Sequence, residues 1–277
     1  MKLAIYLKNE DLENDARFIQ LTNELSLGGC NLYRVSSTEE LEEGTDLLLS
    51  VGGDGTFLKS AAIVAESGLP ILGLNFGRLG FLSENVPSDI AKAIIKDEFI
   101  IEKRSLLSIK TSLPINNSII ESHPFAINEV CMHRSTGAML GVNVRVDGAE
   151  LPTYWADGLL VATSTGSTAY SLSVGGPILL PESKVLIISP IAPHNLNVRP
   201  LIVPDTSEIE LRFIARNDKI MFSLDNRSTE IDANIVVKVS MAHYSLNRLR
   251  LKESNFINTL TNKLFWGEDL RNNITNE

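Results

Sequence analysis

The chain has 277 residues, 44% of them hydrophobic and 21% charged, and its formal net charge is −9 at pH 7. This suffices for one large or two modest globular domains, and the acidic balance repels polyanions, so we expect neither nucleic acid nor a membrane as a partner. Two cysteines are too few for a disulfide framework or a thiolate zinc site. Because no apolar stretch is long enough for a signal peptide or for the roughly 20 residues of a membrane span, we expect a cytoplasmic protein.

The first hundred residues alternate strand-like and helix-like segments. We predict strands in four segments, at residues 2–8, 31–35, 45–51 and 69–76. We predict helices at residues 14–27, in the segment that begins after Gly55, and at residues 89–96. Apolar strands joined through helices are typical of a parallel sheet covered on both faces. The sequence therefore predicts an N-terminal, Rossmann-like α/β domain over residues 1–99.

From about Ile100 the pattern changes to the alternation of half-exposed strands. The apolar members of these strands are Val142, Val144 and Val146; Ile209, Leu211 and Phe213; Ile220, Phe222 and Leu224; Ile235, Val237, Val239 and Met241. Asp147-Gly148 is a hairpin turn signal. We predict a C-terminal β-rich sandwich domain over residues 100–252. In residues 253–277 helical spacing returns, with Phe256, Leu260 and Leu264 on one face, and we expect this segment to dock on the first domain.

Three interpretations compete for the glycine-rich stretch Gly52-Gly53-Asp54-Gly55. The first is a tight strand-to-helix turn in which glycine supplies positive φ. The second is the dinucleotide fingerprint Gly-x-Gly-x-x-Gly, which fails because Leu58 stands at the third glycine position. The third is a phosphate cradle, in which bare backbone N–H groups and the positive end of the following helix surround an anion.

Asp54 indicates which kind of cradle this stretch could form. A carboxylate among phosphate-binding N–H groups repels the phosphate, unless it holds a metal ion or faces the hydroxyl that attacks the phosphorus. The nucleotide-cleaving loop Gly-x4-Gly-Lys-Ser/Thr is excluded, because the chain contains no Gly-Lys pair. The stretch therefore favours phosphoryl transfer by a kinase of a different architecture.

Two further segments have candidate ligand-binding chemistry. Residues 157–179 are rich in glycine and small hydroxyl side chains, which fit either a polar loop between strands or a second part of a binding site. Asn128-Glu129 lies within an apolar strand; an amide beside a carboxylate can bind a purine edge and ribose hydroxyls, or can simply end a strand. The four histidines show no metal-ligand spacing, so we predict no protein metal site.

Taken together, these motifs resemble those of the NAD kinases, which transfer the γ-phosphate of ATP to the 2′-hydroxyl of the adenosine ribose of NAD. The resemblance covers nearly the whole chain in five ordered blocks: GGDGTFL (52–58), GLNFGRLGFL (73–82), INEV (127–130), DGLLVATSTGSTAYSLSVGGPIL (157–179) and SPIAPHNLNVRPLIVPD (189–205). Five ordered blocks are highly specific. The first alone is shared with diacylglycerol, sphingosine and phosphofructo-kinases.

The resemblance implies a role for each matching residue. Asp54 matches the proton acceptor for the attacking hydroxyl, and Gly53 and Gly55 match the turn against the ATP and NAD phosphates. Asn128 and Glu129 match the pair that holds the adenosine part of NAD. The stretch that lines the NAD site is matched by Thr168, Ala169, Tyr170, Ser171 and Ser173.

The remaining matches concern the edges of the site. Asp157 matches a residue that reaches the nicotinamide end, often across a subunit boundary. Lys59, Trp155 and Arg227 fall at variable contact positions, where they would tune donor or acceptor preference. Ser164 replaces a proline of the family pattern, which loosens the loop without removing a ligand.

For the whole molecule, the resemblance implies an N-terminal α/β domain, a C-terminal β-sandwich domain and an active site between them. It also implies NAD and ATP as substrates, Mg²⁺ or another divalent cation bound with ATP, and assembly into a homodimer or homotetramer. The alternatives are a diacylglycerol-type lipid kinase, which shares the Gly-Gly-Asp-Gly-Thr turn, and a non-catalytic nucleotide-binding sensor. The lipid kinase predicts an exposed apolar or basic surface, against which the acidic balance argues; the sensor predicts binding without turnover.

Overall fold

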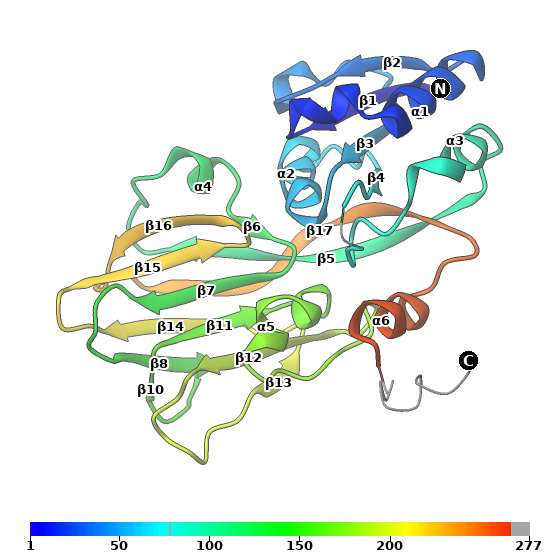
Figure 1. Ribbon diagram of the computed structural model, residues 1–277. Helices are drawn as coiled ribbons and strands as arrows, with labels where there is room; N and C mark the ends of the chain where they lie inside the picture. Colours follow the sequence, from blue (N-terminus) through cyan, green and yellow to red (C-terminus); the bar gives the residue numbers. More distant parts are fainter. Residues whose placement is uncertain (78, 267–277) are drawn as a thin grey trace, which may run out of the picture. The chain divides into compact units, whose positions relative to one another are not determined.

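The computed structural model describes residues 1–77 and 79–266, and the chain divides into two compact units. The first unit comprises Met1–Glu102 and the end of the chain from Asn247; the second comprises Lys103–Leu246. The chain passes between them within two long strands, β5 (Phe99–Thr111) and β17 (Val237–Leu251) (Figure 1). The protein thus has an N-terminal α/β domain and a C-terminal β-sheet domain, the fold class that the sequence predicts.

A parallel sheet forms the centre of the first unit, in the order β17-β4-β3-β1-β2. Its other strands are β1 (Lys2–Leu7), β2 (Asn31–Arg34), β3 (Leu47–Val51) and β4 (Ile71–Leu74). The α-helices of this unit are α1 (Ala16–Leu27), α2 (Asp54–Val64), α3 (Pro87–Ile95) and α6 (Phe256–Leu264), and short 3-10 helices cover Glu10–Asn14 and Thr38–Glu40.

Helices cover both faces of this sheet. Alternate residues of β1, β3 and β4 form a hydrophobic cluster with α1 and α3, built from Leu3, Ile5, Leu47, Leu49, Leu72, Phe18, Leu21, Leu25, Ile90 and Ile94. The helix α2 contacts the same three strands and lies on the other face (Figure 1). Burial from both sides explains why these strands are continuously apolar: every residue of β3 and β4 is buried.

Two predicted helices begin earlier than the sequence indicates. The helix expected after Gly55 begins at Asp54, because Gly53 is the extended N-cap residue (φ −101°, ψ −169°) and a carboxylate in the first turn is favoured by the helix dipole. The helix expected at residue 89 begins at Pro87, whose fixed φ suits the first helical position. Asp54 is therefore a helical residue with a defined side-chain direction.

The second unit is a sandwich of two antiparallel sheets. One has the order β13-β12-β11-β7-β15-β16, and the other includes β10-β8-β14-β17. The strands are β6 (Phe125–Ala126), β7 (Glu129–Arg134), β8 (Leu140–Val146), β9 (Ala149–Glu150), β10 (Tyr154–Ala156), β11 (Gly158–Ala162), β12 (Val185–Ile191), β13 (Leu201–Pro204), β14 (Ile209–Ile214), β15 (Lys219–Leu224) and β16 (Arg227–Asp232). Short helical segments are α4 (Ser118–Ser122), α5 (Tyr170–Ser173) and a 3-10 turn at Thr165–Thr168.

The predicted alternation in this unit is confirmed. Side chains from both sheets meet in one hydrophobic cluster that includes Val142, Val144, Ile209, Leu211, Ile220, Phe222, Leu224, Ile235, Val237 and Val239. The predicted hairpin turn joins β8 to β9, and both of its residues have positive φ, 51° at Asp147 and 82° at Gly148. This backbone conformation matches the right-handed twist of the flanking strands.

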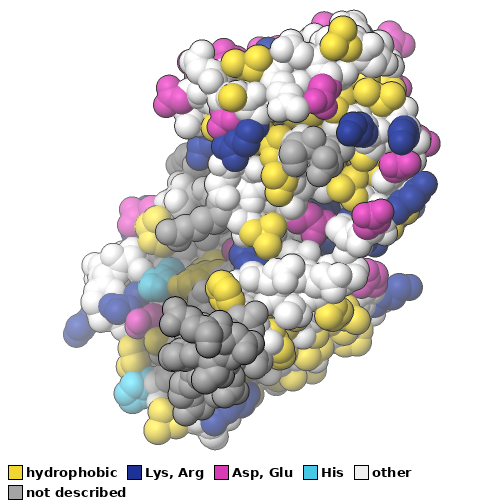
Figure 2. Space-filling model, turned by 45° about the vertical axis from the view of Figure 1, so that its right-hand side comes forward, with side chains coloured by type: hydrophobic (Ala, Val, Ile, Leu, Met, Phe, Trp, Pro, Cys, Tyr) yellow, Lys and Arg dark blue, Asp and Glu magenta, His cyan; other side chains and the backbone are white. Residues whose placement is uncertain are grey.

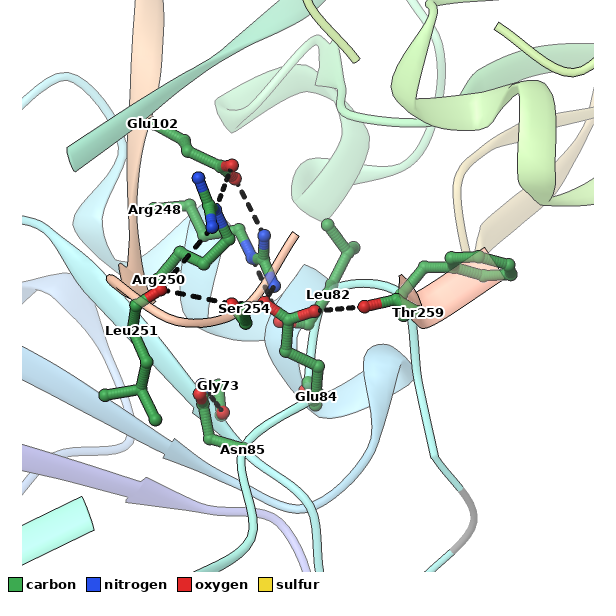
Figure 3. Close-up of polar contacts among 12 residues, drawn as sticks. Gly73, Leu82, Glu84, Asn85, Glu102, Arg248, Arg250, Leu251, Ser254 and Thr259 are labelled. Atoms are coloured by element: carbon green, nitrogen blue, oxygen red, sulfur yellow. Dashed lines mark hydrogen bonds and ion pairs between the residues drawn. The ribbon is translucent and has the colours of Figure 1, made fainter. Parts of the chain in front are cut away.

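The strand β17 continues beyond the apolar segment that predicts it and ends in the first unit, where Arg248 is almost fully buried. Its guanidinium lies 2.8 Å from a carboxylate oxygen of Glu102 and 2.7 Å from one of Glu84 (Figure 3). Arg250 pairs with the same Glu102, and Arg248 Nε donates to the Leu82 carbonyl oxygen at 3.2 Å. A charged residue, Arg248, at a buried position breaks the apolar alternation, which is why the sequence does not reveal this end of the strand.

The helix α6 near the end of the chain belongs to the first unit. The helix α6 buries Leu260 and Thr259, and the hydroxyl of Thr259 donates to Glu84 at 2.7 Å (Figure 3). Residues 267–277 of the predicted segment lie outside the described residues.

Charged side chains are dispersed on the face drawn in Figure 2, where Lys and Arg lie among Asp, Glu and apolar side chains. In the described parts of the chain, every helix is too short or too polar to cross a membrane.

Replacing Arg248 with Met tests the importance of the buried ion pairs. The substitution keeps an unbranched side chain but leaves Glu84 and Glu102 with fewer cationic partners, so we expect a loss of about 3–5 kcal/mol in the free energy of unfolding. Urea denaturation measures this loss. The control is Arg34→Met, which removes an exposed ion pair with Glu13 and should cost less than about 1 kcal/mol. Equal losses in the two variants would contradict the prediction.

Candidate active site

The glycines at the start of the candidate site, Gly52, Gly53 and Gly55, are not all required by the geometry of the turn. Gly52 has φ of 152°, and a Cβ there would lie 2.3 Å from the hydroxyl oxygen of Thr56. At Gly53 and Gly55 the φ is not positive, and an added Cβ would meet no atom within 4 Å. The turn geometry therefore accounts for Gly52 alone. The open space beside Gly53 and Gly55 leaves their backbone accessible to a ligand.

A cavity of about 410 Å³ opens next to Gly52 and Gly53 within the first unit. It is lined by residues that follow the carboxyl ends of β1, β3 and β4, among them Lys8, Asn9, Gly52, Gly53 and Asn75. In open parallel sheets, ligands bind in the crevice outside the carboxyl ends of the strands. The start of α2 adds outward-pointing N–H groups and the positive end of its dipole, and Lys8 adds a cation. This arrangement suits an anionic ligand.

Backbone N–H groups surround the carboxylate of Asp54. Leu82 and Ser83 donate to Oδ1 at 3.0 and 2.8 Å, and Phe81 donates to Oδ2 at 2.9 Å. A Cβ at Gly80 would lie 2.0 Å from Oδ1, so the loop can wrap this closely only because residue 80 has no side chain. The side chain of Asp54 is 31% exposed, and Lys263 Nζ of α6 lies 3.7 Å from Oδ2. Asp54 is thus held rigidly while Oδ2 remains approachable.

In the first unit, Gly53, Asp54 and Gly55 are consecutive residues at the start of α2. Lys59 lies further along α2 and is exposed. The other predicted residues belong to the second unit.

Asn128 and Glu129 are fixed by Asp225, which the sequence analysis does not single out. The side chain of Asp225 accepts hydrogen bonds from the backbone N–H groups of Ile127, Asn128 and Glu129 at 3.0, 2.8 and 3.2 Å. Asp225 adopts φ of 51°, a conformation that Asp tolerates in tight turns. It thereby joins the β15–β16 turn to the start of β7 and sets the direction of both candidate ligand residues.

The polar turn at Thr165–Thr168 packs directly against Asn128. Thr163 N donates to the Asn128 carbonyl oxygen at 2.9 Å, and a Cβ at Gly166 would lie 2.1 Å from that oxygen. The turn can therefore approach only because residue 166 is glycine. The structure thus brings the hydroxyl-rich stretch and the Asn128-Glu129 pair together.

Glu129 is buried, and its Oε2 has no hydrogen-bond partner among the described residues. Loss of hydration raises the pKa of its carboxyl group to about 8, and the nearby charge of Asp225 contributes, while a hydrogen bond from the backbone of Tyr170 opposes the shift. Such a group is protonated at neutral pH and can both donate and accept a hydrogen bond. A buried polar atom without a partner is rare and fits a missing ligand hydroxyl.

The five residues predicted to line the NAD site differ in exposure. Tyr170 and Ser173 are exposed, and Thr168 and Ala169 are partly exposed. Ser171 is buried, with its hydroxyl 3.5 Å from that of Ser189. Ser171 therefore supports the loop from inside, and the other four present the surface that a ligand could contact.

Asp157 and Arg227 form contacts that the sequence does not foresee. The carboxylate of Asp157, just before β11, forms an ion pair with Arg134 at 2.7 Å. Glu129 is the sheet partner of Ala162, the last residue of β11. The guanidinium of Arg227 donates to the backbone carbonyl oxygens of His123 and Phe125, so it fixes the chain before β7. Trp155 is 37% exposed on β10.

Glu129 should make the free energy of unfolding depend on pH. Because its pKa rises from 4.5 to about 8 on folding, the folded protein keeps a proton between these values that the unfolded chain releases. The contribution of Glu129 to the free energy of unfolding is fully present below pH 4.5 and is lost as pH rises through about 8. Its size is on the order of a few kcal/mol.

Urea denaturation of the ligand-free protein at several values from pH 5 to pH 8.5 measures this dependence. Glu129→Gln should flatten it, because the amide does not titrate. The control is Glu121→Gln on α4, where the side chain is exposed and stays hydrated on folding, so the pH dependence should not change. An unchanged slope in Glu129→Gln would contradict the raised pKa.

Comparison with known proteins identifies the family. The ATP-NAD kinase N-terminal domain matches residues 10–98, and the ATP-NAD kinase C-terminal domain matches residues 127–251. The NAD kinase of Flavobacterium psychrophilum is 43% identical over 87% of this chain and 83% of the relative. The NAD kinase of Flavobacterium johnsoniae is 41% identical over 95% of this chain and 90% of the relative.

Solved structures agree. The crystal structure of an NAD kinase from Archaeoglobus fulgidus in complex with ATP matches with a TM-score of 0.77 and 27% identity, over 96% of this chain and 99% of that one. Yeast NADH kinase complexed with NADH has the same fold, with a TM-score of 0.83 at 22% identity over 100% and 90% of the two chains. From the two domain matches and the similarity of the relatives over most of their length, this chain belongs to the NAD kinase family.

Proposed function

We propose that this protein is an ATP-dependent NAD kinase that makes NADP. The 2′-oxygen of the adenosine ribose of NAD forms a bond to the γ-phosphorus of ATP, and the bond from that phosphorus to the β,γ-bridging oxygen breaks. ADP leaves, and the proton of the 2′-hydroxyl passes to Asp54. One observation carries this proposal most directly: a rigidly held carboxylate stands at the first turn of α2, beside two glycines whose lack of a side chain is not required by the fold.

The three N–H groups on Asp54 define its part in the reaction. They fix the carboxylate so that Oδ2 faces the incoming hydroxyl, and this orientation reduces the entropic cost of reaching the transition state. A carboxylate is a weak base for an alcohol, so proton transfer follows most of the phosphorus–oxygen bond formation. Gly53 and Gly55 let the phosphates approach the backbone N–H groups, and exposed Lys59 lies one turn further along α2.

In the second unit, we propose that Asn128 and Glu129 hold the adenosine of NAD. The orphaned Oε2 of Glu129 supports this role, because a ribose hydroxyl would satisfy it. Thr168, Ala169, Tyr170 and Ser173 would contact the dinucleotide, and Ser171 would support them. We assign Arg227 a positioning role through the carbonyl oxygens of His123 and Phe125, and Asp157 the nicotinamide end.

Mg²⁺ or another divalent cation would enter with ATP and would supply charge neutralisation on the phosphates when bound. Magnesium characteristically keeps water ligands and uses substrate phosphates with one or two carboxylates. Among the described residues there is no group of three or more His, Cys, Asp or Glu side chains that could hold a metal ion.

The proposal extends to organisation and location. Residues 1–99, 100–252 and 253–277 would act as the α/β domain, the sandwich domain and the returning helical segment. We propose a homodimer or homotetramer in which Asp157 serves a neighbouring subunit, and sedimentation velocity measures this assembly. Two cysteines with no disulfide framework suit the cytoplasm.

The purified protein should form NADP when supplied with NAD, ATP and magnesium, measured with an NADP-specific dehydrogenase as the reporter. NAD affinity by calorimetry is measured on the same preparation. Binding without product across several divalent cations would indicate the nucleotide sensor. Phosphorylation of diacylglycerol vesicles without NADP formation would indicate the lipid kinase. Either result contradicts the proposed function.

Asp54→Asn should lower turnover by about 10²–10⁴-fold, because the proton acceptor is lost while the shape of the side chain is kept. The affinity for NAD should change little. An amide has one acceptor oxygen, so at least one of the loop N–H groups loses its partner, and we expect the free energy of unfolding to fall by about 1–3 kcal/mol. Kinetics, calorimetry and denaturation on one preparation separate these effects.

The control is Asp46→Asn, which alters a carboxylate that also accepts a backbone N–H, at 2.7 Å, but lies away from the cavity. It should leave turnover within about twofold of the unmodified protein, since its contact is exposed. Near-normal turnover in Asp54→Asn, or a loss of NAD affinity as large as the loss of turnover, would show that Asp54 is not the proton acceptor.

A further inference from the structure

The acceptor positions on Asp54 are nearly all occupied. An ionised carboxylate offers about four lone-pair positions. Two on Oδ1 are taken by Leu82 and Ser83, and one on Oδ2 by Phe81. The position that remains lies on Oδ2, the oxygen that Lys263 approaches to 3.7 Å. A hydroxyl that gives its proton to Asp54 must therefore arrive beside Lys263.

Lys263 is held in this place by more than the attraction of one carboxylate. Its ammonium lies 4.3 Å from the ring centroid of Phe81, within the range of a cation–π contact. The Phe81 ring in turn packs against Phe256 at the start of α6, with 6.0 Å between the ring centroids. A lysine in the last turn of a helix interacts favourably with the helix dipole in any direction of its side chain. The side chain of Lys263 is nevertheless directed towards Asp54 and is only 29% exposed.

The buried ion pairs of the first unit determine where α6 lies. Thr259 donates to Glu84, and Glu84 pairs with Arg248 (Figure 3). Thr259 and Lys263 are four residues apart and therefore lie on the same face of α6. Glu84 directly follows the loop residues whose N–H groups hold Asp54. One carboxylate thus positions both the loop on one side of Asp54 and the lysine on the other.

We propose that Lys263 is a catalytic residue that binds the phosphoryl group in transfer, an inference that rests on the proposed function. The hydroxyl oxygen must come within about 3 Å of Oδ2, and the phosphorus must approach that oxygen to about 3–3.5 Å. An ammonium 3.7 Å from Oδ2, on a flexible four-carbon stem, reaches the oxygens of the phosphoryl group.

In this step Lys263 neutralises charge and exchanges no proton. Negative charge spreads over the three equatorial oxygens of the phosphoryl group as it passes from ADP to the ribose oxygen, and a fixed cation stabilises that distribution. The hydroxyl proton goes to Asp54. The C-terminal helix therefore contributes a group to the reaction centre, in addition to completing the first unit.

Lys263→Met removes the charge and keeps the length of the stem. We expect kcat/KM for ATP to fall by about 10²–10³-fold, with NAD affinity and melting temperature nearly unchanged. Lys263→Arg should retain activity within about tenfold, because it keeps the cation. The matched control is Lys92→Met in the last turn of α3, where the lysine is exposed; it should behave like the unmodified protein.

Three results would overturn the proposal: turnover of Lys263→Met within about twofold of the unmodified protein, a parallel loss of melting temperature and NAD affinity, or an equal loss in the Met and Arg variants.

Calorimetry with inorganic triphosphate separates this proposal from the proposed function. Lys263→Met should bind triphosphate about tenfold more weakly even in a preparation that makes no NADP. Equal triphosphate affinities would reject Lys263 as a phosphate-binding residue while leaving the proposed function intact.

Discussion

The guanidinium of Arg248 is almost fully buried, and a buried charge is tolerated only when it is paired and hydrogen-bonded. This requirement brings together three segments that are remote in sequence: β5 through Glu102, the loop after β4 through Leu82 and Glu84, and the end of β17 itself. From Glu84 the contacts continue to α6 through Thr259. Satisfying one buried cation therefore fixes the loop around Asp54 and the helix that carries Lys263.

The two candidate carboxyl groups, Asp54 in the first unit and Glu129 in the second, have opposite surroundings. Asp54 receives three N–H donors and faces an ammonium group, an environment for an anion that must be held in one orientation. Glu129 is buried with one oxygen unpartnered, and its pKa of about 8 keeps it protonated at neutral pH. The first suits a group that must keep one orientation while a ligand approaches. The second suits recognition, since a neutral carboxyl group can donate to one ribose oxygen and accept from another.

Much of this architecture could be predicted because it rests on side-chain patterns. Continuous apolar runs predict the strands of the parallel sheet, alternation predicts the sandwich, and Asp147-Gly148 predicts its hairpin. The end of β17 could not be found this way, because Arg248 holds a buried position there and its partners Glu84 and Glu102 are far away in the sequence. The residue types of a motif also do not indicate which backbone N–H groups will donate to it. Asp54 is held by such groups, the backbone N–H groups of Phe81, Leu82 and Ser83, so its surroundings could not be predicted.

The candidate site shows the same division. Residue type alone singles out Gly53, Asp54 and Gly55 as candidates, because a carboxylate set among bare glycines is unusual unless it faces a metal ion or an attacking hydroxyl. Asp225 could not, since it lies almost one hundred residues after the backbone groups that it holds. Arg227 has the charge of a ligand contact but donates to two carbonyl oxygens of its own unit. Only the folded chain shows which role a polar side chain has taken.

The return of the chain to the first unit has a consequence for biosynthesis. Residues 1–102 emerge from the ribosome well before Arg248, with all of the second unit between them. At translation rates of about 5–20 residues per second, the interval is roughly 7–30 s. During this interval the β4 edge of the sheet lacks its neighbour β17, and Glu84 and Glu102 lack Arg248 as a cationic partner. The nascent first unit is therefore an incomplete sheet with an open edge and hydrated carboxylates, and it closes only when the last strand is delivered.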